Sequence, residues 1–96
     1  MIEQMMTDAG GKTLTVTWED GRESRLSAEE LRANARDAWT KREMIDTGTV
    51  TVAPGLTITG IHPVGGYGVN LWFSDGHDKA IFPFVYLREL SDAHDN

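Results

Sequence analysis

The chain has 96 residues, a formal net charge of −6 from 15 acidic and 9 basic side chains, and no cysteine. This length supports one small domain, and the lack of cysteine excludes disulfides, thiolate zinc sites and cysteine-ligated iron–sulfur clusters. The acidic balance argues against nucleic acid as a partner. Since no apolar run approaches the roughly 20 residues that span a membrane, we expect a cytoplasmic protein with no membrane partner.

The first predicted elements form a hairpin. Residues 1–12 show no sustained periodicity and end near two glycines, which predicts a flexible lead-in. Residues 13–18 alternate between threonines and apolar side chains, as half-buried strands do. We expect a three-residue loop at residues 19–21, because this loop pairs Leu14 with Leu26 and keeps the apolar ends of both strands on one face.

A helix is predicted after this hairpin. Ser27 and Glu30 have the spacing of a capping box, which marks a helix start. Apolar side chains continue at helical spacing as far as Trp39, so we expect one helix that frays beyond this residue and stops at Gly48. The sequence predicts a short edge strand at residues 49–52, which ends before the Pro-Gly pair at residues 54–55.

Three further strands follow, separated by glycine-containing turns, at residues 56–64, 67–73 and 79–82. The alternation slips at Gly60, which predicts a β-bulge in the first of them. The second has large apolar side chains on both faces and is predicted to be central. A short helix at residues 84–90 precedes a polar tail, residues 91–96, that we expect to be disordered.

These elements predict an α+β fold in a single domain at residues 13–90. We expect one antiparallel sheet of about five strands, a helix after the first hairpin and a short C-terminal helix.

Few side chains suggest a reactive site. His77 follows an Asp-Gly turn that contains Asp75, from which an imidazole could bind a metal or act as a base. His62 lies next to a proline near a strand end, where a hydrogen-bonded, partly buried histidine is the ordinary interpretation. No Ser-His-Asp arrangement stands out. Three aromatic side chains are candidate surface anchors for a protein partner: Tyr67, Trp72 and Tyr86.

Several runs of residues carry a family resemblance: Trp18-Glu-Asp-Gly21, Val64-Gly-Gly-Tyr-Gly-Val69, Trp72-Phe-Ser-Asp-Gly-His77 and Tyr86-Leu-Arg-Glu-Leu90. Together they resemble the small N-terminal domain of gamma-butyrobetaine hydroxylase and trimethyllysine hydroxylase. This family also occurs as stand-alone bacterial proteins, and beside P-loop ATPases that carry iron–sulfur clusters. In the hydroxylases the oxygenase chemistry belongs to a separate C-terminal domain, which nothing in this sequence resembles.

The resemblance also implies a structural zinc and a homodimer. In the hydroxylases the zinc is held by three cysteines and by the histidine of the Asp-Gly-His turn. By position, the histidine ligand falls on His77, and the cysteine positions fall near Ala35, Asp37 and Thr40. Because the thiolates are missing, we expect no cofactor. The alternative is a zinc or iron site formed by His77 and Asp75, with Asp37 or His62 as a further ligand.

The leading functional hypothesis is a non-catalytic accessory or interaction module that forms a homodimer or binds another protein. The alternative is a metal-binding protein linked to iron–sulfur cluster handling, with His77 as the retained ligand. A third hypothesis is a small hydrolase or isomerase that uses His77 with Asp75, for which a chain of this size has little room.

Overall fold

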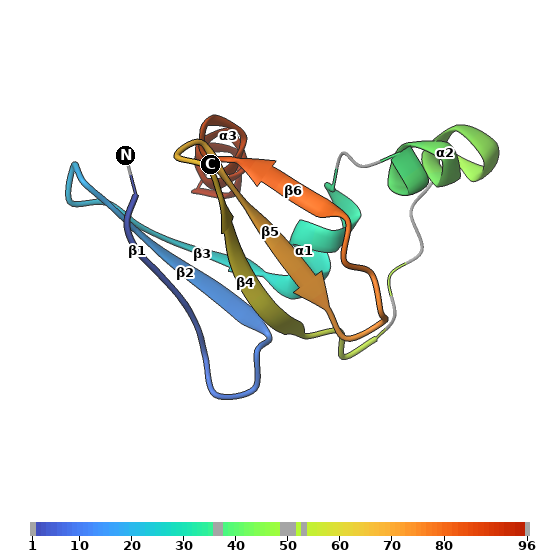
Figure 1. The fold of residues 1–96 in the computed structure, drawn as a ribbon, viewed down its shortest axis with the longest axis horizontal. Coiled ribbons are helices and arrows are strands. Elements are labelled where there is room, and N and C mark those ends of the chain that lie inside the picture. The colour runs from blue at the N-terminus through green and yellow to red at the C-terminus, as the bar shows by residue number, and fades with distance from the viewer. Residues whose placement is uncertain (1, 36–37, 49–51, 53, 96) are drawn as a thin grey trace.

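The structure is a computed structural model that describes residues 2–35, 38–48, 52 and 54–95. The elements in chain order are β1 (Ile2–Thr7), β2 (Thr13–Trp18), β3 (Glu23–Ser27), α1 (Ala28–Ala33), α2 (Ala38–Thr47), β4 (Ile58–Val64), β5 (Gly68–Phe73), β6 (Ala80–Pro83) and α3 (Phe84–Asp95). Figure 1 shows α1 and α3 behind the strands, and α2 projecting to one side beyond β6.

The six strands form two three-stranded antiparallel sheets, in the orders β1-β2-β3 and β4-β5-β6. The α+β class is confirmed, but the expectation of one sheet of about five strands is wrong. The edge strands β1 and β4 line a common groove, and no ladder joins them. The two sheets are instead joined at one end, where the Ile58 N–H donates to the Gly11 carbonyl oxygen at 2.7 Å.

The first strand, β1, was not expected. The prediction of a flexible lead-in at residues 1–12 is wrong for Ile2–Thr7, which pairs along β2. A register shift between Ile2 and Gln4 explains why the sequence shows no alternation there. The bulge adds one residue, so the two side chains that pack against the core, Ile2 and Met5, are three positions apart instead of two or four.

The hairpin between β2 and β3 confirms the predicted loop. Leu14 pairs with Leu26, and the Trp18 N–H donates to the Arg22 carbonyl oxygen at 2.8 Å across a three-residue loop. Gly21 has a φ of +90°, a conformation that glycine adopts without steric cost. The apolar side chains of both strands therefore face the core together.

The predicted long helix is divided into α1 and α2, which is a correction. The Ser27 hydroxyl accepts from the Glu30 N–H at 3.0 Å, so the predicted cap is confirmed. The helix then ends at Asn34, whose carbonyl oxygen accepts from the Tyr86 hydroxyl at 2.7 Å. α2 ends at Gly48 as expected, with a φ of +77°. The predicted strand at residues 49–52 lies outside the described residues except for its last position, which is not in a strand.

The second sheet has β5 at its centre, as predicted, and its β4 strand carries a register shift between Ile58 and Gly60 that confirms the expected bulge. α3 continues as far as Asp95, so the expectation of a disordered tail after residue 90 is wrong. The helix extends because Ser91 is buried and its hydroxyl donates to the Leu87 carbonyl oxygen at 2.8 Å.

The core lies between the sheets and the helices α1 and α3. Its buried apolar side chains come from five strands, from α1 and α3, and from two connecting segments: Leu14, Val16, Trp18, Leu26, Ala28, Leu31, Ala35, Leu56, Ile58, Val69, Leu71, Phe73, Ala80, Phe82, Tyr86 and Leu87. β1 adds only partly buried residues. Among the helices that the structure describes, none is long and apolar enough to span a bilayer.

A charged cluster fastens the β2–β3 loop to α3. Arg88 donates to Asp20 at 2.9 Å, lies 3.4 Å from Asp92, and places its guanidinium 5.1 Å from the centre of the Trp18 ring. Arg22 donates to Asp92 at 3.1 Å. The hydrogen bond from Arg88, aided by the Arg22 backbone N–H, lowers the pKa of the Asp20 carboxyl below its ordinary value, and the same bond raises the pKa of Arg88.

Replacement of the glycine at the sheet junction will test how far the fold depends on it. Gly11 has a φ of +71°, and a Cβ there would lie 2.7 Å from the Ile58 carbonyl oxygen. We expect Gly11→Ala to lower the free energy of unfolding by about 2–4 kcal/mol, from backbone strain plus displacement of β4. The matched control is Gly10→Ala, whose Cβ would meet nothing nearer than Lys12 Cγ at 4.0 Å. Urea denaturation measures the free energy of unfolding of both variants, and equal losses would contradict the role of Gly11 at the sheet junction.

The cluster around Arg88 gives a prediction about pH. A carboxyl whose pKa is lowered by folding adds stability above its ordinary pKa and loses this contribution as the pH falls through the lowered value. The wild type should therefore be more stable than Asp20→Asn at pH 7, and the difference should shrink toward pH 2. Denaturation of both proteins across this pH range measures the difference. A difference that stays constant with pH would show that Asp20 acts without its charge.

Candidate functional site on the outer face of the second sheet

The predicted metal residues lie around the turn between β5 and β6. Asp75 Oδ1 accepts from the His77 N–H at 2.9 Å, which shapes the turn, and Asp75 Oδ2 accepts from Arg32 Nε at 3.3 Å. The Arg32 side chain comes from α1 and is only 4% exposed. Asp75 thus contacts the backbone of His77, and a buried cation lies beside the Asp75 carboxylate.

The remaining positions that the resemblance assigns to zinc ligands do not fit a zinc ion. Ala35 is buried and has no ligand atom, while the Thr40 hydroxyl accepts from Arg32 Nη1 at 2.9 Å. Asp37 lies outside the described residues. Over the described part of the chain, no three His, Asp or Glu side chains come together in a group that could hold a metal. His62 lies elsewhere, on the second sheet.

Arg32 instead links three separate parts of the chain. Its guanidinium belongs to α1, and it bonds to Thr40 at the start of α2 and to Asp75 in the turn between β5 and β6. The Thr40 side chain is itself buried. A buried guanidinium that donates in two directions thus holds α1, α2 and the turn together, which is a structural role.

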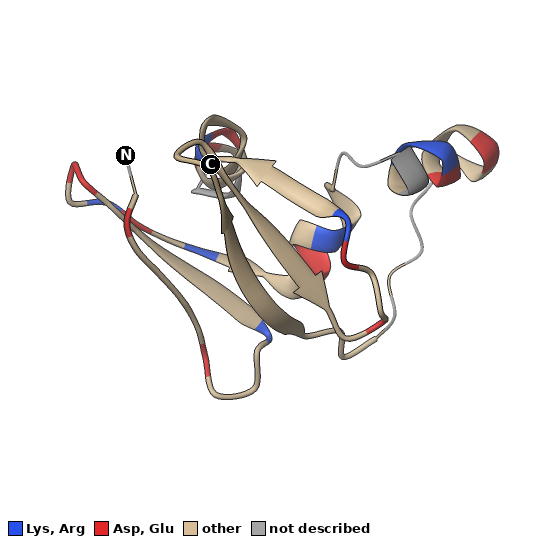
Figure 2. Ribbon diagram, in the orientation of Figure 1, with Lys and Arg blue, Asp and Glu red and all other residues tan. Residues whose placement is uncertain are grey.

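The second sheet exposes a face without charged side chains. The side chains that point away from the core come from all three strands: Gly60, His62 and Val64 from β4, Gly68, Asn70 and Trp72 from β5, and Ile81 and Pro83 from β6. In Figure 2 the strands β4 and β5 carry no Lys, Arg, Asp or Glu, and these residues lie on the helices, the turns and the first sheet. We call these eight residues the outer face.

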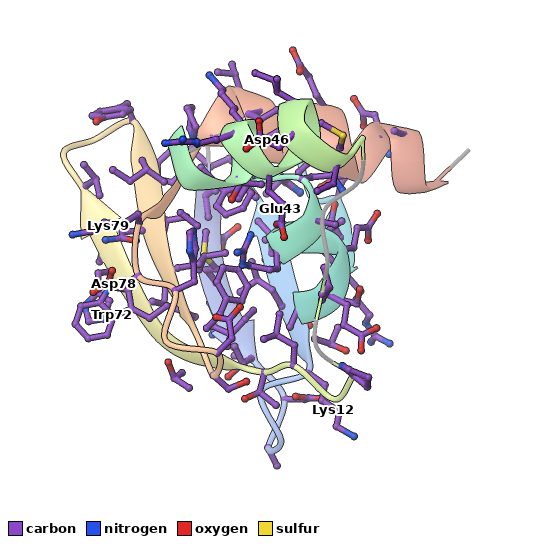
Figure 3. The ribbon with its side chains drawn as sticks, turned by 90° about the vertical axis from the view of Figure 1, so that its right-hand side faces the viewer. Lys12, Glu43, Asp46, Trp72, Asp78 and Lys79 are labelled. Carbon is purple, nitrogen blue, oxygen red and sulfur yellow. The ribbon has the colours of Figure 1, made fainter. Side chains whose placement is uncertain are left out.

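Trp72 is the largest side chain of the outer face. It is 42% exposed, and Figure 3 shows its ring on the outer side of the sheet, near Asp78 and Lys79. The His62 ring packs against it with centroids 4.3 Å apart. Gly60 leaves room for this contact, because a Cβ there would lie 2.6 Å from His62 Nε2. The two rings therefore form a prearranged aromatic surface.

The other predicted anchors divide between surface and core. Tyr67 is exposed at the turn that precedes β5, and Ile81 is 41% exposed on β6. Tyr86 is buried, stacks on Phe82 with centroids 6.1 Å apart and donates its hydroxyl to Asn34, which removes it from the predicted anchors. Asn70, between His62 and Ile81, has a buried amide oxygen that finds no hydrogen-bond partner among the described residues.

Sequence reasoning selected Trp72 but missed the rest of the outer face. The signal that could have found it is a gap in the charges: no Asp, Glu, Lys or Arg occurs between Asp46 and Asp75, in a chain where a quarter of all residues are charged. Most charged residues are kept out of folded interiors, so an uncharged window usually indicates burial. Here the window also supplies an exposed surface.

The elements and the outer face define a small α+β domain with an uncharged sheet surface. The chain belongs to the family described as gamma-butyrobetaine hydroxylase-like, N-terminal, whose family model matches residues 6–88. The resemblance seen in its motifs is therefore confirmed, although this chain has no cysteine. No catalytic domain is identified in it. None of the curated proteins matches the sequence significantly.

Solved structures support the same family. A crystal structure of a protein of unknown function from Acidithiobacillus ferrooxidans, assigned to the DUF971 family, is 33% identical with a TM-score of 0.74. The alignment covers 94% of this chain and 91% of that one. Two NMR solution structures are 26% and 27% identical, with TM-scores of 0.75 and 0.73. They align with 97% and 99% of this chain, over 70% and 75% of their own length.

The link through Arg32 can be tested by substitution. Arg32→Met keeps an apolar stem but removes the guanidinium, so a buried hydroxyl and a partly buried carboxylate lose their donor. We expect the free energy of unfolding to fall by about 2 kcal/mol, less than for a fully buried pair because Asp75 reaches solvent. The control is Arg25→Met, whose exposed pair with Glu23 at 3.4 Å should change stability by less than about 0.5 kcal/mol. Similar losses in both variants would refute the link.

Proposed function

We propose that this chain is a non-catalytic interaction module that forms a homodimer through the outer face of its second sheet. The observation that carries this proposal is an uncharged sheet face with Trp72 exposed at its centre strand, on a chain with a net charge of −6. The family supports an accessory role, because it is named for an N-terminal domain and no catalytic domain is identified in this chain.

Exposure of the outer face leaves apolar area in water. Trp72 on β5 and Ile81 on the adjacent β6 are both more than two fifths exposed. Removal of apolar area from water contributes about 25 cal/mol per Å². Contiguous exposed apolar side chains of this kind are typical of interaction surfaces. A partner that covers the outer face therefore gains most where Trp72 lies.

Charge permits a second copy as this partner, because the outer face itself has no Asp, Glu, Lys or Arg. Two chains of −6 each repel one another, and contacts through charged surfaces add local repulsion. None of the eight residues of the outer face is Asp, Glu, Lys or Arg, although Asp78 and Lys79 lie near Trp72 in Figure 3, so the face itself pairs no like charges across a dimer.

The size of the outer face sets the expected affinity. Three strands spaced about 4.8 Å apart, each about 20 Å long, give a flat contact of roughly 300 Å² per partner, not counting the area that projecting side chains add. This area is below the roughly 800 Å² per partner of stable complexes. We therefore expect a weak, concentration-dependent dimer with a dissociation constant above about 1 μM.

A pair of isoleucine variants gives a matched test. Ile81→Lys places a charge on the outer face, while Ile45→Lys places the same charge on α2, where Ile45 is 82% exposed. Both variants change the net charge from −6 to −5, so they differ only in position. We expect Ile81→Lys to weaken dimerisation by at least about tenfold in sedimentation equilibrium, and Ile45→Lys to leave it unchanged.

Two outcomes would refute the proposal. The first is a wild type that stays monomeric up to about 1 mM, since a dimer weaker than this has no use in a cell. The second is an equal loss of dimer in both variants, which would place the contact elsewhere or show a general effect of charge. Circular dichroism of each variant confirms that the fold is retained.

A further inference from the structure

A second surface lies between the two sheets, where the edge strands β1 and β4 border a common groove. It is a mostly apolar groove of about 390 Å³, lined by residues 2–5 of β1, by Ile61 and Pro63 of β4, by Gly68 and Val69 of β5, and by Phe84 at the start of α3. Because four consecutive residues of β1 line the groove, the backbone edge of this strand borders it as well as its side chains.

The edge of β1 that faces the groove is open. β1 pairs with β2 on one side, and no described backbone hydrogen bond joins its other side to β4. After its bulge, β1 is regular from Gln4 to Thr7, and the unpaired N–H and C=O groups of this short edge are a template for a further strand. The opposite wall is less suited to pairing, because Pro63 has no N–H to donate. An added strand would therefore pair with β1.

The charges around the groove select its occupant. Glu3 is exposed at its rim and is the only charged residue among the residues described as lining it. Met5, Ile61 and Phe84 are partly buried apolar side chains that pack against the core. An extended segment that alternates apolar and basic residues matches both features, since its apolar side chains enter the groove and a basic one meets Glu3.

A second copy of this chain does not fit the groove. Its own β1 is bordered by its own β4 wall, so two copies cannot approach edge to edge along β1 without collision of these walls. The net charge of −6 further favours a basic partner over an acidic copy.

We propose that the groove between β1 and β4 binds an extended segment of a partner protein, with alternating apolar and basic residues, which pairs as an added strand with β1. This binding site shares only Gly68 with the outer face of the second sheet and does not depend on dimerisation.

A peptide titration of the full chain tests the proposal. The probe is an acetylated and amidated hexapeptide of alternating lysine and valine, added up to about 1 mM to the isotope-labelled protein and followed by NMR. We expect the amide resonances of β1 and of Phe84 to shift, and those around Trp72 to stay in place. N-methylation of alternate peptide amides keeps the side chains but removes strand pairing, and should weaken binding by about tenfold or more.

Two variants with equal net charge test the selection by charge. Glu3→Lys and Glu89→Lys both change the net charge from −6 to −4, but only Glu3 lies at the groove. Glu3→Lys should weaken binding about threefold, as expected for one exposed ion pair, and Glu89→Lys should have a smaller effect. Absence of shifts in β1, equal binding of the N-methylated peptide, or shifts in β1 that depend on protein concentration without peptide would each overturn the proposal.

Discussion

The fold depends on a close contact between two backbones at Gly11. This residue lies between β1 and β2, and its carbonyl oxygen accepts from the first residue of β4, Ile58. The approach leaves no room for a side chain, and the conformation is one that glycine alone adopts freely. This single junction fixes one end of the second sheet against the first. The separation of β1 from β4 beyond this point, and therefore the groove, follows from it.

Much of the fold could be predicted wherever the determining interactions are local. The hairpin between β2 and β3 follows from the alternation of apolar residues and from a glycine in its loop. The helix start at Ser27 follows from a cap between two residues that are three positions apart. The end of α1 could not be predicted, because Asn34 is held by the hydroxyl of Tyr86, which is 52 positions away in the sequence. Residues 33–39 favour a helix by composition, and a distant side chain overrides this preference.

The same division applies to the candidate site. Alternation in β5 shows that Trp72 points away from Val69, Leu71 and Phe73, but it does not show which face a helix covers. That choice depends on where α1 and α3 pack, which is a property of the whole chain. The metal hypothesis also depended on the packing of the whole chain. The sequence does not show that Arg32 is buried between three elements and occupies the space beside Asp75.

The two register shifts between paired strands in the described part of the chain lie in the edge strands β1 and β4, one between Ile2 and Gln4 and the other between Ile58 and Gly60. A bulge bends and twists its strand, so a regular partner cannot pair along its full length. Together with Pro63, the bulges give the chain protection against aggregation by edge-to-edge stacking of many copies. Shortening β1 or β4 by the extra residue would regularise the strand, and the resulting protein should be prone to form fibrils during storage at high concentration.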